Sequence, residues 1–338
     1  MNKTEQGVRQ LNEIKISLIQ VILLVACYLA STVSAEELPA DTGSAANETE
    51  KQHVFVLSTA ENALQSDIIQ ALSENLKRKL PNVVIIRATP EDKKLAPDNS
   101  TDIIIGIGPA GMKSANTHYP KARKLFISTN PNRYRLDKNK YKDDAILYMS
   151  QPYCRQIKFI KLIHEDWKVI GLLNSQKKPV DIRAIKRCAK SYEMELYTVK
   201  TTAGNNLSDD VKLVLDHSDL LLALPDKNIY NSRTVKNILL TSYRYRKPVI
   251  AFSRNFVNAG ALASIHSSAE QIGESASRLI EYSFKHDLQF KKPVNYPLSF
   301  DVDINRQVFK ALGLPTPNLY RLKQELINNS PEKQGHIR

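Results

Sequence analysis

Cysteine is scarce in this sequence: the 338 residues include three, and these form no CxxC motif. The seven histidines form no HxxxH motif either, so the clustered ligands typical of a zinc site are missing. No Ser/His/Asp or Cys/His set has the spacing of a nucleophilic site, and no two carboxylates form a pair suited to acid–base catalysis. We therefore expect a protein that is not an enzyme and that holds neither a metal nor a cofactor.

Long hydrophobic runs are scarce as well. The run near the N-terminus, 16–30, follows three basic residues and is shorter than the roughly 20 apolar residues of a transmembrane helix. Small residues follow it at 31–35, an order typical of an export signal. We expect cleavage after Ala35. Alternatively, LVAC (24–27) acts as a bacterial lipobox, cleavage precedes Cys27, and that cysteine carries a lipid anchor; either cut predicts a periplasmic or otherwise extracytoplasmic protein.

The other two cysteines, Cys154 and Cys188, fall in predicted helices. Outside the cytoplasm thiols meet oxidising conditions, so a disulfide between these two is possible. Their spacing alone does not decide whether it forms.

The charge of the chain is strongly positive, with a formal net charge of +13. The lysines nevertheless alternate with acids, as in EDKK (91–94) and DKNKYKDD (137–144), which indicates solvated surfaces. The segment YRYRK (243–247) mixes aromatic and basic residues as nucleic-acid-binding surfaces do, but it also stands where a helix C-terminus favours cations. We expect no nucleic-acid partner.

After a polar segment without periodicity at 36–52, predicted to be a flexible tether, apolar runs alternate with segments of helical spacing. The runs form two series: 53–58, 82–88, 101–108, 124–129 and 145–150, then 167–175, 194–200, 218–226 and 248–253. Because each run is continuous, its strand is expected to be covered on both faces, as in a parallel sheet. The sequence therefore predicts an α/β fold with two doubly wound lobes.

Further strands and helices are predicted after these two series. GALASI (260–265) predicts one more short strand, and a helix is expected to begin at Ser267, with Glu270 at the spacing of a capping box. A strand at 296–304 is predicted before another helix, which has Asn305 as its N-cap and Gly313 at its end. Such additional elements are expected when the chain crosses between two lobes more than once, so that several crossover strands join them.

From this order we predict lobe 1 at 53–150 plus about 265–290, and lobe 2 at 151–264 plus about 296–328. The export signal occupies 1–35, and a polar tail follows at 329–338.

Several segments resemble the substrate-binding proteins of ABC transporters with the type 1 periplasmic-binding fold, in the branch that includes tryptophan- and tyrosine-binding lipoproteins. They are LLLALPDKN (220–228), KPVIAFSRNFVNAGALASI (247–265), EQIGESASRLI (270–280) and YPLSFDVDINRQVFKALGLPTP (296–317). The resemblance covers about 53–320 and implies two Rossmann-like lobes joined by crossover strands. It also implies a solute-binding protein that captures a small molecule, an amino acid or a related one, by hinge closure and presents it to a membrane permease.

Two features depart from the family pattern. Near the first crossover, where family members commonly have Thr-Gly, this chain has DDAILYMSQPYCRQ (143–156), and the usual Asp-Pro appears as Asn130-Pro131. The alternative function is therefore a non-transport protein of the same fold, with a degenerate cleft, that contacts a sensor or another envelope protein. In either case we expect a monomer.

Polar or glycine-rich residues end the predicted strands, where open α/β sheets bind their ligands. Asp226 is predicted either to meet a ligand's ammonium group or to cap the following helix. Arg254 either pairs with an anion or lies outside the cleft as a solvated side chain, and His266 is assigned to the hinge or the lining. Each Ser, Thr or Asn among the candidates could instead only cap a helix. The candidate ligand-binding residues are Ser58, Thr59, Gly108, Pro109, Ala110, Asn130, Asn174, Ser175, Asp226, Asn228, Ser253 and Arg254.

The segment GIGPAG (106–111) fits GxGxxG after a strand, a pattern that also marks dinucleotide-binding sites. It follows the third strand of its lobe, however, and no acidic residue ends the next strand. We therefore prefer a helix N-terminus whose backbone N–H groups receive a ligand carboxylate or another anion, with Pro109 in the first turn.

Overall fold

The structure is a computed structural model that describes residues 52–59, 63–92, 95–98, 100–128, 143–175, 180–201 and 206–328. The predicted export signal with Cys27, almost all of the predicted tether, Asn130 and the predicted tail lie outside these residues. Residues 51–338 form a compact unit by themselves. A search of the described residues for an apolar helix of membrane-spanning length found none.

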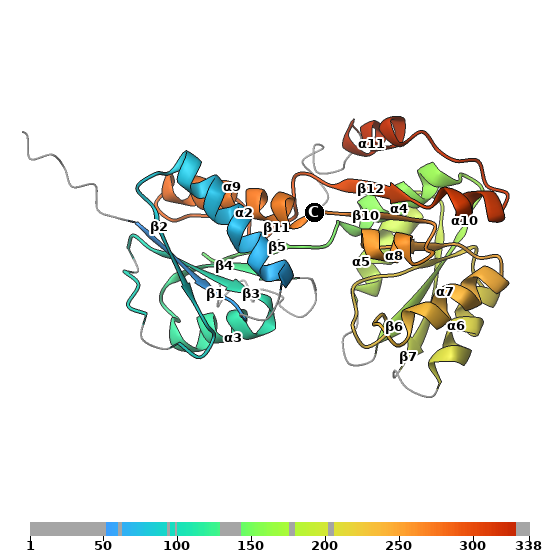
Figure 1. The fold of residues 1–338 in the computed structure, drawn as a ribbon, viewed down its shortest axis with the longest axis horizontal. Helices are drawn as coiled ribbons and strands as arrows, with labels where there is room; N and C mark the ends of the chain where they lie inside the picture. Colours follow the sequence, from blue (N-terminus) through green and yellow to red (C-terminus); the bar gives the residue numbers. More distant parts are fainter. Residues whose placement is uncertain are drawn as a thin grey trace, which may run out of the picture. The chain divides into compact units, whose positions relative to one another are not determined.

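The first lobe is built on a six-stranded sheet, in which all strands pair in parallel (Figure 1). The strand order is β11 (Val294–Asn295), β5 (Ala145–Tyr148), β4 (Arg123–Ser128), β3 (Ile103–Ile107), β1 (His53–Leu57) and β2 (Val84–Ala88). Helices α2 (Ala63–Lys79) and α3 (Gly108–His118) come from the same stretch of chain, whereas α9 (Ala269–Phe284) returns from the C-terminal part and packs beside α2.

The second lobe has a six-stranded sheet of its own, parallel except for the antiparallel pair β10–β12. Its order is β12 (Asp301–Ile304), β10 (Ala263–His266), β9 (Val249–Ala251), β8 (Leu220–Leu222), β6 (Val169–Ser175) and β7 (Glu195–Thr201). Its helices are α4 (Tyr153–Ile163), α5 (Ile182–Lys190), α6 (Leu207–Asp216), α7 (Val235–Arg244), α8 (Arg254–Asn258), α10 (Arg306–Ala311) and α11 (Leu319–Asn328).

Both sheets are covered on two faces, which confirms the α/β fold class predicted from continuous apolar runs. Successive strand residues point to opposite faces, so a two-sided cover requires every position to be apolar. In β8, Leu220 and Leu222 enter one hydrophobic cluster and Leu221 enters another. In β3, Ile103 and Ile104 divide in the same way between the two clusters of the first lobe.

Some local predictions were wrong. The N-cap of α9 is Ser268, whose side chain forms a capping box with Gln271, because the hydroxyl of Ser267 is used elsewhere. The strand predicted at 296–304 is regular only as β12, since residues 296–300 connect β11 in one sheet to β12 in the other.

Both ends of the helix predicted after Asn305 are confirmed. The side chain of Asn305 accepts hydrogen bonds from the backbone N–H groups of Gln307 and Val308 and so caps α10. Gly313 follows α10 with φ of 72°, a left-handed conformation that glycine adopts without strain.

A disulfide joins Cys154 of α4 to Cys188 of α5, with their Cα atoms 4.9 Å apart. The bond decides the question that spacing left open. It closes a loop of 34 residues in sequence, which restricts the unfolded chain.

We expect the double variant C154A/C188A to lose about 2–4 kcal/mol of unfolding free energy, because its unfolded chain regains the entropy that the cross-link removes. Urea unfolding followed by circular dichroism measures the change. Wild-type protein kept in a reductant is the matched control and should unfold at the same urea concentration as the variant. Identical midpoints for oxidised and reduced wild type would contradict the prediction.

Candidate functional site

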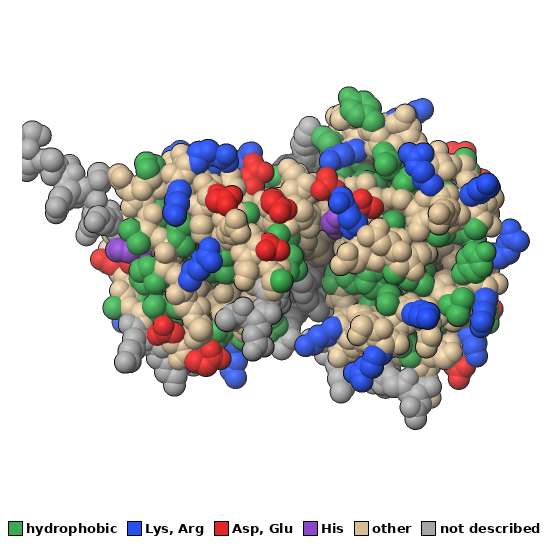
Figure 2. Space-filling model, viewed as in Figure 1, with side chains coloured by type: hydrophobic (Ala, Val, Ile, Leu, Met, Phe, Trp, Pro, Cys, Tyr) green, Lys and Arg blue, Asp and Glu red, His purple; other side chains and the backbone are tan. Residues whose placement is uncertain are grey.

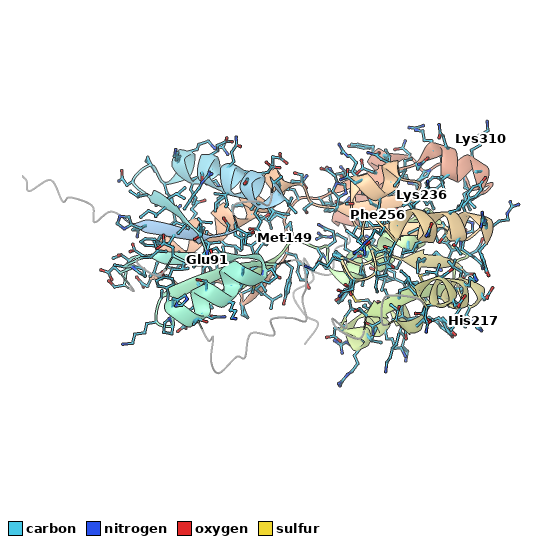
Figure 3. The ribbon with its side chains drawn as sticks, turned by 60° about the horizontal axis from the view of Figure 1, so that its bottom comes forward. Glu91, Met149, His217, Lys236, Phe256 and Lys310 are labelled. Atoms are coloured by element: carbon cyan, nitrogen blue, oxygen red, sulfur yellow. A yellow bond between two sulfur atoms is a disulfide. The ribbon has the colours of Figure 1, made fainter. Side chains whose placement is uncertain are left out.

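A pocket of about 440 Å³ lies beside the segments that connect the two sheets. Seven of its lining residues are apolar: Leu64, Met149, Pro225, Phe252, Ile265, Ala269 and Ile272. Its polar lining residues are Ser150, Gln151, Gln156, Ser253, Arg254, Asn255, His266, Ser267 and Ser268. Met149, labelled in Figure 3, stands where the chain leaves the first sheet.

The place of this pocket follows from the topology. Met149 follows β5, Pro225 follows β8, and Phe252 and Ser253 follow β9, all at the carboxyl ends of parallel strands. The chain reverses there into loops and helices, which leaves side chains free to line a hollow. Residues of both lobes therefore contribute to one pocket.

Two predicted site residues line the pocket. Ser253 precedes α8 with an extended backbone and makes no side-chain capping bond. Arg254, with 62% of its side chain exposed, donates from Nε to Oδ1 of Asp303 at 3.1 Å. The positive charge of Arg254 is thus balanced by a carboxylate from β12.

Four other predicted residues of lobe 2 are not part of this lining, and three have hydrogen bonds within their own loops. Oδ1 of the buried Asp226 accepts from the backbone N–H and from Nδ2 of Asn228, both at 2.9 Å. Oδ1 of Asn174 accepts from the N–H of Val180 at 3.1 Å, and Ser175 ends β6 as a buried residue.

The predicted residues of lobe 1 also fall outside this lining. The N–H and Oγ1 of Thr59 both donate to Oε1 of Gln65, at 3.1 and 3.2 Å, while the N–H of Ser58 donates to the carbonyl of Ala88. Gly108 begins α3 with φ of 66°, and the following Pro109 and Ala110 are exposed.

The glycines of GIGPAG have a packing role. A Cβ on Gly111 would lie 2.2 Å from the carbonyl oxygen of Leu57 in β1, and one on Gly106 would lie 2.9 Å from the Cα of Met112. Helix α3 can therefore lie close to β1 and β3 only when both positions lack a side chain. Close packing accounts for this GxGxxG pattern without a dinucleotide.

The crossover segments are tied to one another by side-chain hydrogen bonds that the sequence analysis did not predict. Nε2 of Gln151, in the first crossover, donates to Oγ of Ser267 in the second at 2.7 Å. The same Oγ donates to the carbonyl of Ser299 in the third, also at 2.7 Å. Nη1 of the buried Arg155 donates to Oε1 of Gln151, and its guanidinium lies 4.8 Å from the ring centre of Phe300.

His266 contributes a ring to the pocket lining. Its Nδ1 lies 3.5 Å from Oδ2 of Asp303 and 3.3 Å from Oγ of Ser264. Burial lowers the pKa of His266 below its usual value, with a smaller contribution from Arg254, although Asp303 and Asp301 act in the opposite direction. The lowered pKa favours the neutral ring, so Arg254 is the charged residue of the described lining.

The sequence was also compared with known families. The family described as ABC transporter substrate binding protein matches residues 149–322, just over half of the chain. The chain belongs to this family. As a member it is a substrate-binding protein, and the resemblance stated from sequence is confirmed.

Solved structures similar to this substrate-binding protein share its fold. A conserved domain protein from Vibrio cholerae has 17% identity, a TM-score of 0.57, and coverage of 81% of this chain and 98% of its own. A domain from Streptococcus pneumonia in complex with L-Trp has 18% identity and a TM-score of 0.58, and the match covers 81% of this chain and 98% of that domain. A ligand-free, open substrate-binding protein with adhesive properties from Clostridium difficile has 15% identity and a TM-score of 0.60, and the match covers 79% of this chain and 96% of that protein.

At these identities the likeness shows the fold alone, namely that of type 1 periplasmic-binding proteins. No curated protein matches the sequence.

Several lining residues were missed by the sequence analysis, among them Met149, Phe252 and Asn255. All three stand within a few residues of a strand's carboxyl end. This position was the only feature of the sequence that could have indicated that they line the pocket. Their residue types gave no signal, because Met and Phe at such places are more often core.

We expect Q151A to lower the free energy of unfolding by about 1–3 kcal/mol. The substitution removes one hydrogen bond of the buried Arg155 and one of the half-buried Ser267. Urea unfolding measures the loss. The control S150A changes the neighbouring residue of the same crossover and should stay within about 0.5 kcal/mol of wild type. Equal stability of the two variants would show that the bonds of Gln151 contribute nothing.

Proposed function

We propose that this substrate-binding protein captures a small molecule in the pocket beside the crossovers and closes its two lobes over it. The observation that carries the proposal is a pocket at the carboxyl ends of strands to which both lobes contribute lining residues. A molecule that contacts both lobes stabilises the closed form by its higher affinity for that form.

The connections between the sheets support hinge motion. Because Gln151, Ser267 and Ser299 join the three crossovers by hydrogen bonds, we infer that these segments move together as one hinge. Bending is then left to the few backbone bonds on either side of the bonded residues. The two lobes that close over the ligand in this proposal are those predicted from the sequence: 53–150 with about 265–290, and 151–264 with about 296–328.

The ligand that we propose is an amino acid or a related molecule. The apolar lining, with Phe252 and Met149, supports an apolar or aromatic side chain. For the ammonium group we propose Asp226, which is buried beside the lining residue Pro225. Arg254 or the backbone N–H groups at the start of α3 would receive the carboxylate. The related domain in complex with L-Trp supports this class by analogy.

We propose that the loaded protein acts outside the cytoplasm and delivers its ligand to the permease of an ABC transporter. Family membership supports both points. The proposal keeps the predicted export signal, with cleavage after Ala35 or lipidation at Cys27.

A second candidate function is a non-transport role in the cell envelope. It is favoured by the first crossover, where Gln151 and Arg155 fill the positions near which family members commonly have Thr-Gly and are engaged in bonds to each other. In this case the fold would be kept and the pocket would have no ligand to bind.

We expect one compound class to raise the melting temperature of the protein in a thermal-shift screen of L-amino acids, small organic acids and nucleosides. A ligand at a hundred times its Kd adds about 2.7 kcal/mol to the unfolding free energy. In N255W an indole would fill the pocket and remove the shift, since Asn255 lines it.

The matched control is N258W, which places the same side chain on an exposed residue of the same short helix outside the lining. It should keep the shift. No shift with any compound class would contradict capture of these ligands and favour the second candidate function.

We expect D226N to bind the amino acid found in that screen about tenfold or more weakly, because the amide cannot neutralise an ammonium group. Its stability should match wild type, since the amide keeps the Oδ1 that accepts from Asn228. Isothermal titration calorimetry and urea unfolding measure the two quantities. Unchanged affinity would limit Asp226 to the turn that it forms.

A further inference from the structure

A second hollow, of about 370 Å³, lies between α6 and α7 on the second lobe. Its floor is apolar, because Leu207, Val211 and Ile238 face it from the hydrophobic cluster beneath the two helices. Leu240 lines it while 44% exposed. We call this hollow the α6–α7 groove; the ligand pocket described above shares no lining residue with it.

The ends of the α6–α7 groove are basic. Arg233 stands just before α7 and Arg244 is its last residue; both line the groove and both are exposed. The remaining lining residues are uncharged: Ser208, Thr234, Asn237 and Thr241. The acids in the first turn of α6, Asp209 and Asp210, do not line the groove, and Asp209 pairs with Lys212 at 3.1 Å.

The sequence around α7 extends this charge. Residues 227–247 contain six lysines and arginines and no acidic residue. The same two helices carry exposed apolar side chains, Leu213 at 44% and Tyr243 at 56%. Figure 2 shows basic and hydrophobic side chains mixed over the region of α6 and α7. A partner for this face must therefore supply both acidic and apolar groups.

We propose that the α6–α7 groove docks an acidic amphipathic helix of another protein. Its apolar side chains lie on Val211, Ile238 and Leu240, and carboxylates at its two ends pair with Arg233 and Arg244. The ten residues of α7 span about 15 Å, so the carboxylates stand about three helical turns apart on the partner. Apolar contacts hold the helix, and the two guanidiniums fix its register.

The groove fits this occupant better than other anionic partners. A nucleic acid would set phosphates and sugars against the apolar floor and the exposed Leu240, where it has no apolar side chains to offer. A lipid surface could contact the exposed Leu240, but it would leave the buried apolar floor of the hollow uncovered, whereas side chains of a helix can enter the hollow.

The test is binding of a labelled helical peptide to the full chain, measured by fluorescence anisotropy at low salt. The peptide carries leucines on one face and glutamates about three turns apart. We expect saturable binding that is weakened about tenfold or more in R233E/R244E, because each change turns an attraction into a repulsion. In N237W an indole would fill the groove without a change in charge and should also abolish binding, since Asn237 lines it and is exposed.

The matched control is K291E/K310E, which makes the same change in net charge at two exposed lysines outside both the lining and residues 227–247; Lys310 is labelled in Figure 3. It should alter affinity about threefold or less. Equal loss in both double variants would overturn docking in the groove and leave only general attraction. Tighter binding of an RNA oligonucleotide or of anionic vesicles than of the peptide would also overturn the proposal, as would self-association of the protein through this face.

Discussion

The hydrogen-bond chain from Gln151 through Ser267 to the carbonyl of Ser299 is the contact on which the arrangement of the site depends. It joins three segments that are far apart in the sequence and that each run between the two sheets. The guanidinium of Arg155 reinforces it from α4 by a bond to Gln151 and by its place over Phe300. A buried polar group of this kind is stabilising only while its partners are present, which makes the crossovers depend on one another.

The chemistry of the pocket follows from what surrounds these crossovers. The charge of Arg254 is balanced by Asp303, and burial favours the neutral ring of His266 by lowering its pKa. The rest of the described lining combines apolar side chains with uncharged hydrogen-bonding groups. The basic face at α6 and α7 stands in contrast, because its guanidiniums at Arg233 and Arg244 have no carboxylate beside them in the groove lining.

Sequence patterns predicted the strands from their continuous apolar runs. Runs such as Leu220–Leu222 are apolar at every position because both faces of the sheet are covered. The polar residues that end strands proved harder to interpret: Asp226 and Asn174 bond within their own loops, and Ser267, expected as a helix cap, links crossovers instead. A hydroxyl or carboxylate at a strand end fits each of these roles equally well, and only its neighbours in space decide between them.

The sequence by itself determined the α/β class, the alternation of strands and helices in two series, and the family, because hydrophobic period and turn residues act over a few positions. Only the tertiary structure decided that α9 packs beside α2, that β11 extends the first sheet, and that Cys154 meets Cys188. It also decided which strand ends share a pocket. The physical reason is that such contacts join residues distant in the chain, and their geometry depends on how whole layers pack rather than on any local pattern.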